Sequence, residues 1–445
     1  TILEDVNAVD AWLGTTPGLP YANVRKSIVS SLNLGHMAPL ASVWAGPTEN
    51  RHLGGPPLIM ARSSSGTPFR ISLHNGDVGH AMVVGPTGAG KSVLLALMAL
   101  QFRRYRNARV FVFDKGRSAR AALLAMGGAA YDLSLSGRLS FQPLSRIDEA
   151  AEMSFAHDWV LGLLQQEGAG PTPAIRDAVW TALASLAATP VRQRTLTGLA
   201  ALIQSENLRL ALQPYTLEGP YGALLDADTD DLADGDAAVF EMEALMQTPR
   251  LAAPVLAYLF HRLEERFDGA PTLLILDEAW VFLDHPMFAA RLRDWLKTLR
   301  KKNVSVVFAT QSLADISAST IAPALIESCP SRIFLPNARA EEPGQACAYD
   351  AFGLTPRQVE LISRAAPKRD YYLQCPAGNR LFELDLGPVA LAFCAAGSKT
   401  DQAAIDAVLE DEGPFAPAWL AARGLGWAAG LIHDPEEGAL ACAAE

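Results

Sequence analysis

HAMVVGPTGAGKSVLLALM, residues 80–98, places a glycine-rich turn and a lysine between two apolar runs. The run before the turn, 80–84, is typical of a buried strand, and residues 93–102 have the apolar spacing of a helix. Residues 85–92 match the pattern G-x-x-x-x-G-K-[ST] at every fixed position. We therefore predict a strand, a phosphate-binding loop and a helix in that order.

The residue types of this loop suit a nucleotide phosphate. Glycines let successive backbone N–H groups turn inward around a phosphate, and the N-terminal end of the helix adds a positive dipole. Lys91 is predicted to reach the β- and γ-phosphates, and the Ser92 hydroxyl to bind Mg²⁺. The alternative is a glycine-rich turn that matches by chance, which the flanking strand and helix disfavour. The predicted nucleotide-binding set is Gly85, Pro86, Thr87, Gly88, Ala89, Gly90, Lys91, Ser92 and Val93.

A second β-rich run ends in two carboxylates. Residues 272–276 are apolar, as expected for a strand buried on both faces, and Asp277 and Glu278 follow them. Asp277 is predicted to hold Mg²⁺ together with Ser92, and Glu278 to take a proton from the attacking water. The alternative is a strand that simply ends in a solvated acidic turn.

Two further strands are expected to bring polar residues to the same edge of the sheet. Residues 304–309 lead to Gln311, which we predict to hydrogen-bond the γ-phosphate or the water. A strand-terminal glutamine without a role is the alternative. Asp114, Lys115 and Ser118 follow the strand ARVFVFD, where they could lie near the nucleotide, although a loop without a catalytic part is the favoured interpretation.

The composition bounds the class of protein. The chain has 445 residues, of which 50% are hydrophobic and 19% charged, so it can bury one large core or two modest ones. No apolar run approaches the roughly 18 residues of a membrane-spanning helix, so none is predicted. The net charge of −11 provides no overall attraction to nucleic acid or anionic lipid.

The cysteines argue against a disulfide framework or a zinc site. They are odd in number, far apart and without a C-x-x-C pair, which suits a reducing cytosol. We therefore assign them no role in the predicted chemistry. The five cysteines are Cys329, Cys347, Cys375, Cys394 and Cys442.

A basic helix is predicted over residues 286–302, between the acidic strand and the strand that leads to Gln311. Its apolar residues fall on one face, and Arg291, Arg293 and Lys297 lie elsewhere. A surface helix with a solvated charged face is the favoured interpretation. Non-specific contact with DNA, or contact with a neighbouring subunit, is the alternative.

The spacing of the motifs indicates an α/β fold with an insertion. Residues 148–236 lack β-rich runs and show helical patterns, so we predict an all-helical subdomain inserted into the α/β core. The chain begins without methionine and in mid-pattern, and we expect an N-terminal part to be missing. The predicted division is a linker or remnant of that part packing on the core (1–76), the first core part (77–147), the helical subdomain (148–236), the second core part (237–396) and a C-terminal helical tail (397–445).

Arginines near predicted strand ends are candidates for action between subunits. In ring ATPases an arginine of one subunit neutralises transition-state charge in the next, which is worth about 10³ to 10⁵ in rate. Arg332 opens a predicted strand, and Arg369 and Arg380 lie in two alternating strands around a Pro-Ala-Gly-Asn turn. We select Arg332 and Arg380 as catalytic candidates. A salt bridge or a surface position is the alternative for each.

Six segments in order carry a resemblance to a known family: HAMVVGPTGAGKSVLL, FDKGRS, LLILDEAW, FATQS, ESCPSRIFLPN and RLFELDLGPVALAF. Together the chain resembles the conjugal-transfer ATPases of type IV secretion systems, of the TrbE/CagE/VirB type, from about Tyr21 to Phe393. The resemblance implies a RecA-like P-loop NTPase core with a mostly parallel sheet, and hydrolysis of ATP with Mg²⁺ to energise pilus biogenesis and substrate transfer. It also implies a homo-oligomer, expected to be a hexamer, that docks with other secretion components at the cytoplasmic face of the inner membrane.

Two other functions remain open from the sequence. A DNA-pumping or helicase-like ATPase of the same superfamily would share the core, and its hydrolysis would respond to nucleic acid with a steep salt dependence. A nucleotide-gated assembly scaffold would bind ATP and hardly hydrolyse it. The paired Asp277 and Glu278 and the following Gln311 favour hydrolysis over a scaffold.

Overall fold

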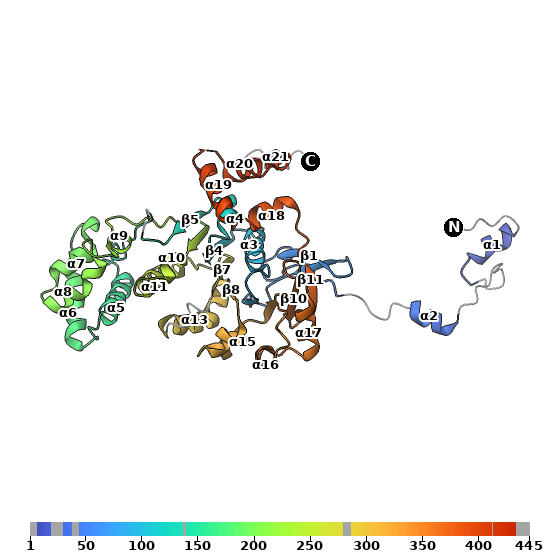
Figure 1. Cartoon of the computed structure of the whole chain (residues 1–445), viewed down its shortest axis with the longest axis horizontal. Helices are drawn as coiled ribbons and strands as arrows, with labels where there is room; N and C mark the ends of the chain where they lie inside the picture. Colours follow the sequence, from blue (N-terminus) through green and yellow to red (C-terminus); the bar gives the residue numbers. More distant parts are fainter. Residues whose placement is uncertain are drawn as a thin grey trace. The chain divides into compact units, whose positions relative to one another are not determined.

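The structure is a computed structural model with two compact units, Thr1–Trp44 and Ala45–Glu445. The first unit contains helices α1 (Ala8–Gly14) and α2 (Ser31–Met37). All elements described below belong to the second unit (Figure 1). The residues that the structure describes are 7–18, 30–37, 44–135, 137, 139–278, 286–411 and 413–432.

A mixed sheet forms the centre of the second unit (Figure 1). Its strands are β1 (Ile59–Ser63), β2 (Pro68–Ile71), β3 (Ala81–Val84), β4 (Arg109–Asp114), β5 (Ala129–Asp132), β6 (Ala237–Glu241), β7 (Thr272–Leu276), β8 (Val304–Thr310), β9 (Ser331–Phe334), β10 (Asp370–Cys375) and β11 (Gly378–Glu383). In the described part of the chain, the sheet has eleven strands in the order β2-β1-β11-β10-β9-β3-β8-β7-β4-β6-β5. Neighbours from β9 to β5 are parallel, and those from β2 to β9 are antiparallel.

Helices connect and cover the strands. They are α3 (Lys91–Phe102), α4 (Arg120–Ala125), α5 (Ala150–Gln166), α6 (Pro173–Ala187), α7 (Leu196–Leu202), α8 (Glu206–Leu212), α9 (Gly222–Leu225), α10 (Glu243–Met246), α11 (Pro249–Glu264), α13 (Pro286–Thr298), α14 (Leu313–Ala318), α15 (Ala322–Ser328), α16 (Pro343–Ala351), α17 (Pro356–Arg364), α18 (Pro388–Cys394), α19 (Lys399–Leu409), α20 (Phe415–Ala422) and α21 (Gly426–Ala429). Short 3₁₀ turns are η2 (Val191–Gln193), η3 (Gln213–Tyr215) and η4 (Leu299–Lys302). Of the helices among the described residues, none combines the length and the apolar character that crossing a membrane requires.

The parallel half of the sheet brings the ends of distant strands to one edge. The register pairs Val84 of β3 with Thr310 of β8, and Leu276 of β7 with Phe113 of β4. Every residue of β3, β7 and β8 is buried, as the apolar composition of these strands predicts for a sheet covered on both faces. The predicted α/β fold with a mostly parallel sheet is confirmed.

Alternate residues of the central strands pack on opposite faces. Phe113 of β4 belongs to the large apolar cluster, where its ring lies 4.9 Å from that of Phe240 and 5.2 Å from that of Phe260 of α11. Its neighbour Val112 therefore points to the other face. Helix α3 lies against β4 and β7, and α18 lies against α3 and α4. The sheet is thus a buried layer that holds the strand ends rigidly.

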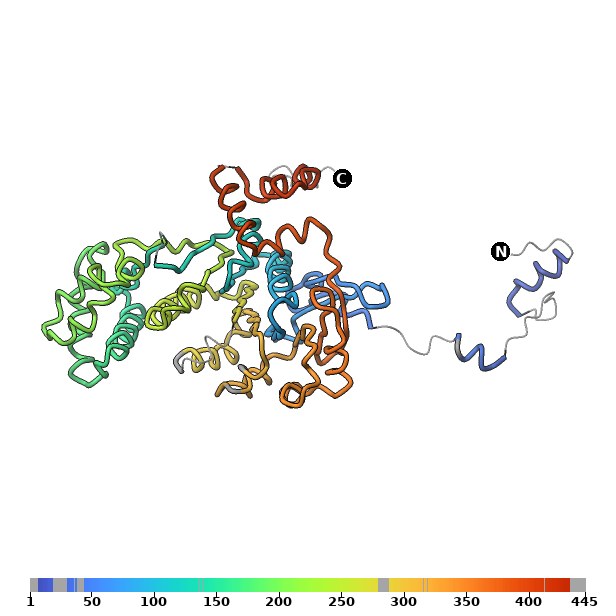
Figure 2. The backbone as a smooth tube through the Cα atoms, viewed as in Figure 1, coloured from blue at the N-terminus to red at the C-terminus, as the bar shows by residue number. Residues whose placement is uncertain are grey.

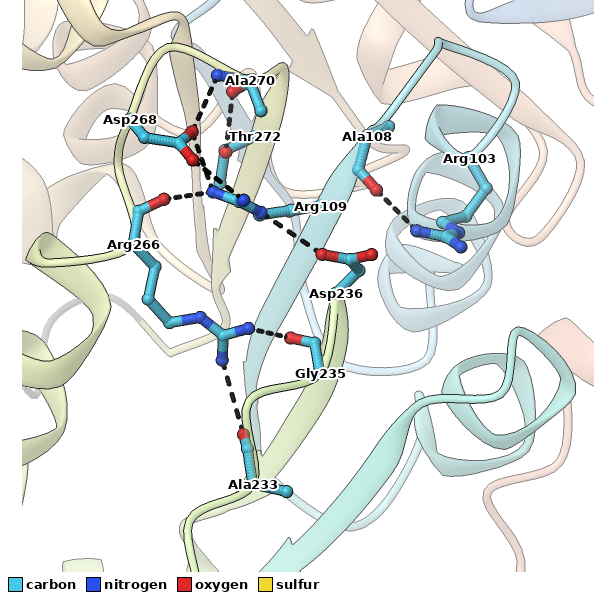
Figure 3. A network of polar contacts seen from close by, with 10 residues as sticks. All are labelled: Arg103, Ala108, Arg109, Ala233, Gly235, Asp236, Arg266, Asp268, Ala270 and Thr272. Atoms are coloured by element: carbon cyan, nitrogen blue, oxygen red, sulfur yellow. Dashed lines mark hydrogen bonds and ion pairs between the residues drawn. The ribbon is translucent and has the colours of Figure 1, made fainter.

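A network of arginines fixes the opposite edge of the same strands (Figure 3). Arg109, the first residue of β4, contacts Asp268 at 2.9 Å and Asp236 at 3.3 Å. It also donates to the backbone carbonyl of Arg266, whose own guanidinium donates to Gly235 and lies over the ring of Phe111. These contacts tie the starts of β4, β6 and β7 together, so that their other ends keep a constant spacing.

The segment between β5 and β6 contains helices α5 to α9 and, among its described residues, no strand (Figure 2, green). Pro254 inside α11 has no N–H, so the carbonyl of Arg250 four residues earlier lacks its usual helix partner. The side-chain amide of Gln166 in α5 donates to that carbonyl at 2.8 Å, and the indole N–H of Trp159 donates to the Pro254 carbonyl at 3.0 Å. Helix α11, which lies between β6 and β7, is therefore where the helical segment joins the core.

The structure differs from the predicted boundary at residue 76. Strands β1 and β2 lie within the predicted linker, yet they pair with each other and with β11 in the sheet of the second unit. Phe69 of β2 is fully buried, and its ring lies 5.8 Å from that of Phe382 in β11. These strands are short, so their alternation is too brief to stand out in the sequence.

The C-terminal helices form a small cluster of their own beside α4. Trp419 of α20 is fully buried in this cluster with Phe393 of α18 and Ile405 of α19, and its indole N–H donates to the Ala392 carbonyl at 2.9 Å. Helix α18 thus packs with the predicted tail, although it lies before residue 397. The last predicted tail residues, 433–445, lie outside the described residues and include Cys442.

Candidate functional site

The glycine-rich loop between β3 and α3 needs its glycines. Gly88 and Gly90 have φ angles of +81° and +109°, which favour glycine. A Cβ atom on Gly90 would lie 2.6 Å from the Tyr371 hydroxyl, and one on Gly85 would lie 2.4 Å from Cβ of Leu335. Both approaches are closer than carbon atoms tolerate. The loop therefore bends into a shape that larger residues cannot adopt at these positions.

Neighbouring backbone holds this loop in place from the antiparallel half of the sheet. The N–H of Lys368 donates to the Ala89 carbonyl at 2.9 Å, and the Tyr371 hydroxyl donates to the Gly90 carbonyl at 3.2 Å. On its other side, the Gly85 N–H donates to the Thr310 carbonyl at 3.1 Å. The loop is thus fixed before any ligand binds, which reduces the entropic cost of ligand binding.

The lysine of the loop lies between the two carboxylates that follow β7. Its Nζ is 3.0 Å from Oδ1 of Asp277 and 3.1 Å from Oε1 of Glu278, and the Lys91 side chain is 8% exposed. The Gln311 amide donates to Oε1 of Glu278 at 2.6 Å, and the Thr87 hydroxyl donates to Oε1 of Gln311 at 2.6 Å. The structure therefore brings together Lys91, Asp277, Glu278 and Gln311 from three segments distant in sequence.

The acidic pair lies in an unusual environment. Burial raises the pKa of Asp277, although the ammonium of Lys91 opposes this effect. The backbone of Glu278 has a φ of +53°, a left-handed conformation that costs energy in a residue with a side chain. Its N–H donates to Oδ1 of Asp277 at 3.0 Å. This bend turns the Glu278 side chain toward Lys91 and Gln311.

These residues line one cleft of about 1210 Å³, which is large enough for a nucleoside triphosphate. Its walls come from the loops after β3, β4, β7 and β8 and, across from them, from β11 and α18. Its lining residues are Arg62, Pro86, Thr87, Gly88, Gly90, Lys91, Ser92, Val93, Lys115, Gly116, Ser118, Glu243, Asp277, Glu278, Gln311, Lys368, Arg369, Tyr371, Glu383, Leu384, Asp385, Leu386, Leu391, Cys394, Ala395, Gly397 and Ser398.

The oxygen atoms at the base of this cleft suit a magnesium ion. Ser92, the second residue of α3, and Asp277 both line the cleft, and they offer a hydroxyl and a carboxylate oxygen. Mg²⁺ prefers one or two such protein ligands and completes its shell with phosphate oxygens and water. The donor set therefore fits the ion that the sequence predicts.

Arg332 lies away from the cleft and uses its guanidinium within its own chain. It donates to the carbonyls of Ile326 at 2.6 Å, Phe352 at 2.7 Å and Cys329 at 3.3 Å. These contacts join β9 to the ends of α15 and α16. The structure does not bring Arg332 together with Lys91 and the acidic pair.

Arg380 also lies outside the residues that line the cleft. Its guanidinium lies over the ring of Phe69, 5.5 Å from the ring centroid. Arg380 precedes Glu383, a cleft residue of the same strand β11, by three positions. Arg369, in contrast, lines the cleft and contacts Glu383 at 2.7 Å. Of the three arginines, Arg369 is therefore the one at the rim.

The basic helix predicted over 286–302 is α13 with η4. Arg291 forms an ion pair with Glu264 of α11, and Arg293 donates to the Thr320 carbonyl at 3.1 Å. Arg291 and Arg293 thus contact groups of their own chain, whereas the interpretation favoured from the sequence is a solvated charged face.

Sequence reasoning missed the wall that the antiparallel half of the sheet contributes. Arg62 of β1 contacts Glu383 of β11 at 3.1 Å and Asp385 at 3.2 Å, and all three line the cleft. Lys368, with a φ of +65°, lines it from the turn before β10. Glu383 and Asp385 lie in the segment RLFELDLGPVALAF, which carries the family resemblance, but nothing in the sequence places that segment beside β1, because β1 and β11 are distant in sequence and meet only in the folded sheet.

Comparison with known proteins places this arrangement among conjugation proteins. A family model described as TraG P-loop domain matches residues 199–370. Conjugal transfer protein TrbE of Rhizobium radiobacter is 44% identical over 95% of this chain and 53% of its own length. A probable conjugal transfer protein TrbE of Sinorhizobium fredii is 43% identical over 97% of this chain and 66% of its own length. The chain spans between about half and two thirds of these curated relatives.

Solved structures show the same fold at low identity. VirB4 of Thermoanaerobacter pseudethanolicus matches 75% of this chain and 97% of its own, with a TM-score of 0.59 and 18% identity. The plasmid coupling protein TrwB, in complex with the non-hydrolysable ATP analogue ADPNP, matches 81% of this chain and 93% of its own, with a TM-score of 0.51 and 16% identity. The expected RecA-like P-loop NTPase fold is confirmed.

Proposed function

Since the chain belongs to the TrbE/VirB4 family of conjugal transfer and type IV secretion proteins, we propose that it hydrolyses ATP to drive that transfer. The observation that carries this proposal is the contact of Lys91 with the paired carboxylates Asp277 and Glu278 inside the cleft. A lysine, a metal-binding carboxylate and a second carboxylate next to it are the parts that phosphoryl transfer to water requires.

Each residue of the cleft has a distinct part in the proposed reaction. The backbone N–H groups of the loop 85–92 cradle the phosphates, and Lys91 contacts the β- and γ-phosphates. Ser92 and Asp277 hold Mg²⁺, which neutralises charge on the phosphate oxygens when it is bound. Glu278, whose carboxylate is positioned by Lys91 and Gln311, orients the attacking water and accepts its proton.

Gln311 is the proposed sensor of phosphate loss. Its amide donates to Glu278 and its carbonyl oxygen accepts from Thr87 of the phosphate-binding loop. A change at the γ-phosphate therefore alters both contacts, and Gln311, which lies between β8 and α14, passes the change to α14. This coupling is how hydrolysis would shift one part of the molecule against another.

The assembly is proposed from the family relationship. We infer a homo-oligomer, expected to be a hexamer, in which an arginine of the adjacent subunit completes each site. It would act at the cytoplasmic face of the bacterial inner membrane with other type IV secretion components. The transport role rests on relatives of which this chain spans only part.

A single-turnover assay with radiolabelled ATP tests hydrolysis. Glu278→Gln is expected to bind ATP about as well as the wild type and to lose about 10²- to 10⁴-fold in turnover, because proton acceptance is lost while the contacts to phosphate remain. Lys91→Ala is expected to lose binding. Lys301→Ala, a charge removal at an exposed site in η4 before β8, serves as the matched control. Equal turnover in wild type and Glu278→Gln would remove Glu278 from the mechanism.

A further inference from the structure

The loop after β4, residues 115–119, lies beside the acidic pair in the sheet. The register pairs Phe113 of β4 with Leu276 of β7, so that Lys115 stands one strand away from the position of Glu278. Adjacent strands are about 4.8 Å apart. On the β4 side of β7, away from β8, this loop is therefore the nearest neighbour of Asp277 and Glu278.

Two buried carboxylates hold this loop by its backbone and hydroxyl groups. Oδ1 of Asp114 accepts from the Ser118 hydroxyl at 2.8 Å, and Oδ2 accepts from the Ala119 N–H at 2.8 Å. Oε1 of Glu241, at the end of β6, accepts from the Gly116 N–H at 3.1 Å, and its Oε2 accepts from the next N–H. Asp114 is 1% and Glu241 is 8% exposed. Carboxylates buried in this way cost energy that ordinary surface loops do not require.

The backbone of the loop is correspondingly constrained. Gly116 and Arg117 have φ angles of +88° and +56°, two successive left-handed residues of which one carries a side chain. Burial raises the pKa of Asp114 to about 7, and the neighbouring Asp277 adds to this effect. Such a combination of strain and buried charge is typical of a loop whose shape is needed for a site.

Part of this loop lines the cleft. Lys115, Gly116 and Ser118 line the same cleft as Lys91 and Glu278. Within the described part of the chain, Lys115 has no carboxylate within ion-pair distance, whereas Lys91 is shared between two. Lys115 is thus a cation presented to the cleft by a rigid turn, beside the carboxylate that would activate the water.

We propose that Lys115 is a second phosphate-binding lysine, which contacts the terminal phosphate of a nucleoside triphosphate, and that Asp114 and Glu241 are positioning residues for it. This inference rests on the proposed function. We assign the terminal phosphate to Lys115 because Lys115 lies beside Glu278, where water would attack the γ-phosphate. Lys115 does not lie beside β3, the strand that leads into the loop 85–92. A cation there stabilises charge on the γ-phosphate, which a diphosphate lacks.

The test compares the affinities of the full chain for ADPNP and for ADP. Lys115→Ala is expected to weaken ADPNP binding about 10- to 100-fold, as the loss of one hydrogen bond to a charged group predicts, while the Kd for ADP changes less than about threefold. Lys115→Arg is expected to retain most of the affinity, because it keeps the charge. Lys301→Ala, at the exposed site in η4, is the matched control and should change neither constant.

A second part of the experiment tests the positioning residues Asp114 and Glu241. Glu241→Gln and Asp114→Asn are expected to lower ADPNP affinity in the same direction but less than Lys115→Ala, with ADP affinity kept, because each loosens the turn that presents Lys115. A purely structural role would weaken both nucleotides together. If circular dichroism shows that either variant does not fold, the comparison of the Lys115 variants with the wild type still tests the proposal.

The outcomes separate this inference from the proposed function. Wild-type chain that binds neither nucleotide would overturn both. Wild-type chain that binds both nucleotides, with Lys115→Ala unchanged or weakened equally for ADPNP and ADP, would overturn the inference alone. Selective loss of ADPNP in Lys115→Ala supports it.

Discussion

Single residues with unfavourable conformations gather at the cleft. Gly88 and Gly90 are left-handed, and so are Glu278 and Arg117, although these two carry side chains. Such conformations persist only where surrounding contacts enforce them. In this chain, those contacts are the hydrogen bonds that the carboxylates of Glu241 and Asp277 accept from backbone N–H groups, and the bond from the Tyr371 hydroxyl to the Gly90 carbonyl. These residues line or adjoin the cleft. Among the residues with side chains, Lys368 and Asp385 at the cleft share the left-handed conformation, whereas Asn107 and Asn303 adopt it in turns away from the cleft.

Gly90→Ala is expected to abolish nucleotide binding. Its Cβ atom would meet the Tyr371 hydroxyl at 2.6 Å, and a φ of +109° is unfavourable for alanine. Binding of a fluorescent ATP analogue is the measurement. Gly162→Ala in α5, where a Cβ atom meets nothing within 4 Å, is the matched control and is expected to bind normally. Normal binding by Gly90→Ala would mean that the loop adopts another shape.

His80 is expected to make the fold acid-sensitive. Burial lowers the pKa of His80 to about 4, and its Nδ1 accepts from the Val306 N–H at 3.1 Å, so the ring is neutral when folded. The unfolded chain binds the proton more tightly, so stability is complete above the unfolded pKa and falls as the pH drops from about 6.5 toward 4. From pH 7 to 5 this residue alone should lower the free energy of unfolding by about 2 kcal/mol.

Urea unfolding at several pH values measures this effect. His80→Asn keeps an acceptor for the Val306 N–H but cannot be protonated, so its free energy of unfolding should fall less between pH 7 and 5. His74, whose pKa burial also lowers to about 4, keeps part of the dependence in that variant. Identical slopes in the two proteins would show that His80 does not carry the effect.

At the level of elements, a buried arginine joins the helical segment to its base. Arg194 follows η2 and donates to the carbonyls of Ala187 at 3.0 Å, Ser145 at 2.9 Å and Thr189 at 3.2 Å. Ala187 lies in the last turn of α6, where backbone carbonyls have no N–H partner within their own helix. One side chain therefore both ends α6 and ties it to the turn that leads from the core.

Arg194→Ala is expected to destabilise the chain by about 3 kcal/mol, because three backbone carbonyls and the Asp148 carboxylate lose one charged donor together. The measurement is the free energy of urea unfolding. Arg192→Ala, an exposed arginine in η2 two residues earlier, is the matched control and should change it by less than about 0.5 kcal/mol. Equal effects of the two substitutions would contradict this role of Arg194.

Across the second unit as a whole, the sheet joins two halves with different tasks. The parallel half carries the glycine-rich loop 85–92 and the acidic pair, and the antiparallel half supplies the opposite wall through Arg62, Arg369 and Glu383. The contact of the Lys368 N–H with Ala89 couples the halves directly at the loop. A shift of one half would therefore move the loop 85–92.

The proposed assembly predicts complementation between variants. Lys91→Ala cannot bind ATP but keeps its arginines, and Arg380→Gln binds ATP but lacks one candidate arginine, so a mixture should regain ATPase activity that each lacks alone. Arg332→Ala should instead lose stability without complementation, since its guanidinium donates to carbonyls of its own chain. Activity of mixtures against protein concentration is the measurement. Failure of all mixtures would exclude Arg380 as the shared residue.

Local patterns predicted much of this molecule. The glycine loop, the acidic pair and Gln311 follow apolar strands whose composition is itself the signal, and the structure brings Lys91, Glu278 and Gln311 into contact. The domain limits were harder: β1 and β2 lie inside the predicted linker, because strands of four or five residues leave too brief a pattern. The partners of Arg332 and Arg380 were equally out of reach of the sequence, because the position of an arginine in a strand does not determine which groups its guanidinium contacts.

Residue order along the chain was enough to predict the strand, the glycine-rich loop and the helix, and the strand that ends at Asp277 and Glu278, because backbone conformation and burial at those positions depend on neighbours in sequence. Which strands lie side by side became clear only in the folded molecule. Pairing of β11 with β1, and of β4 with both β6 and β7, brings Arg62 to Glu383 and Glu241 to the loop of Lys115. Those contacts join segments far apart in the chain, and the burial of the whole sheet, not any local preference, provides the free energy that makes them.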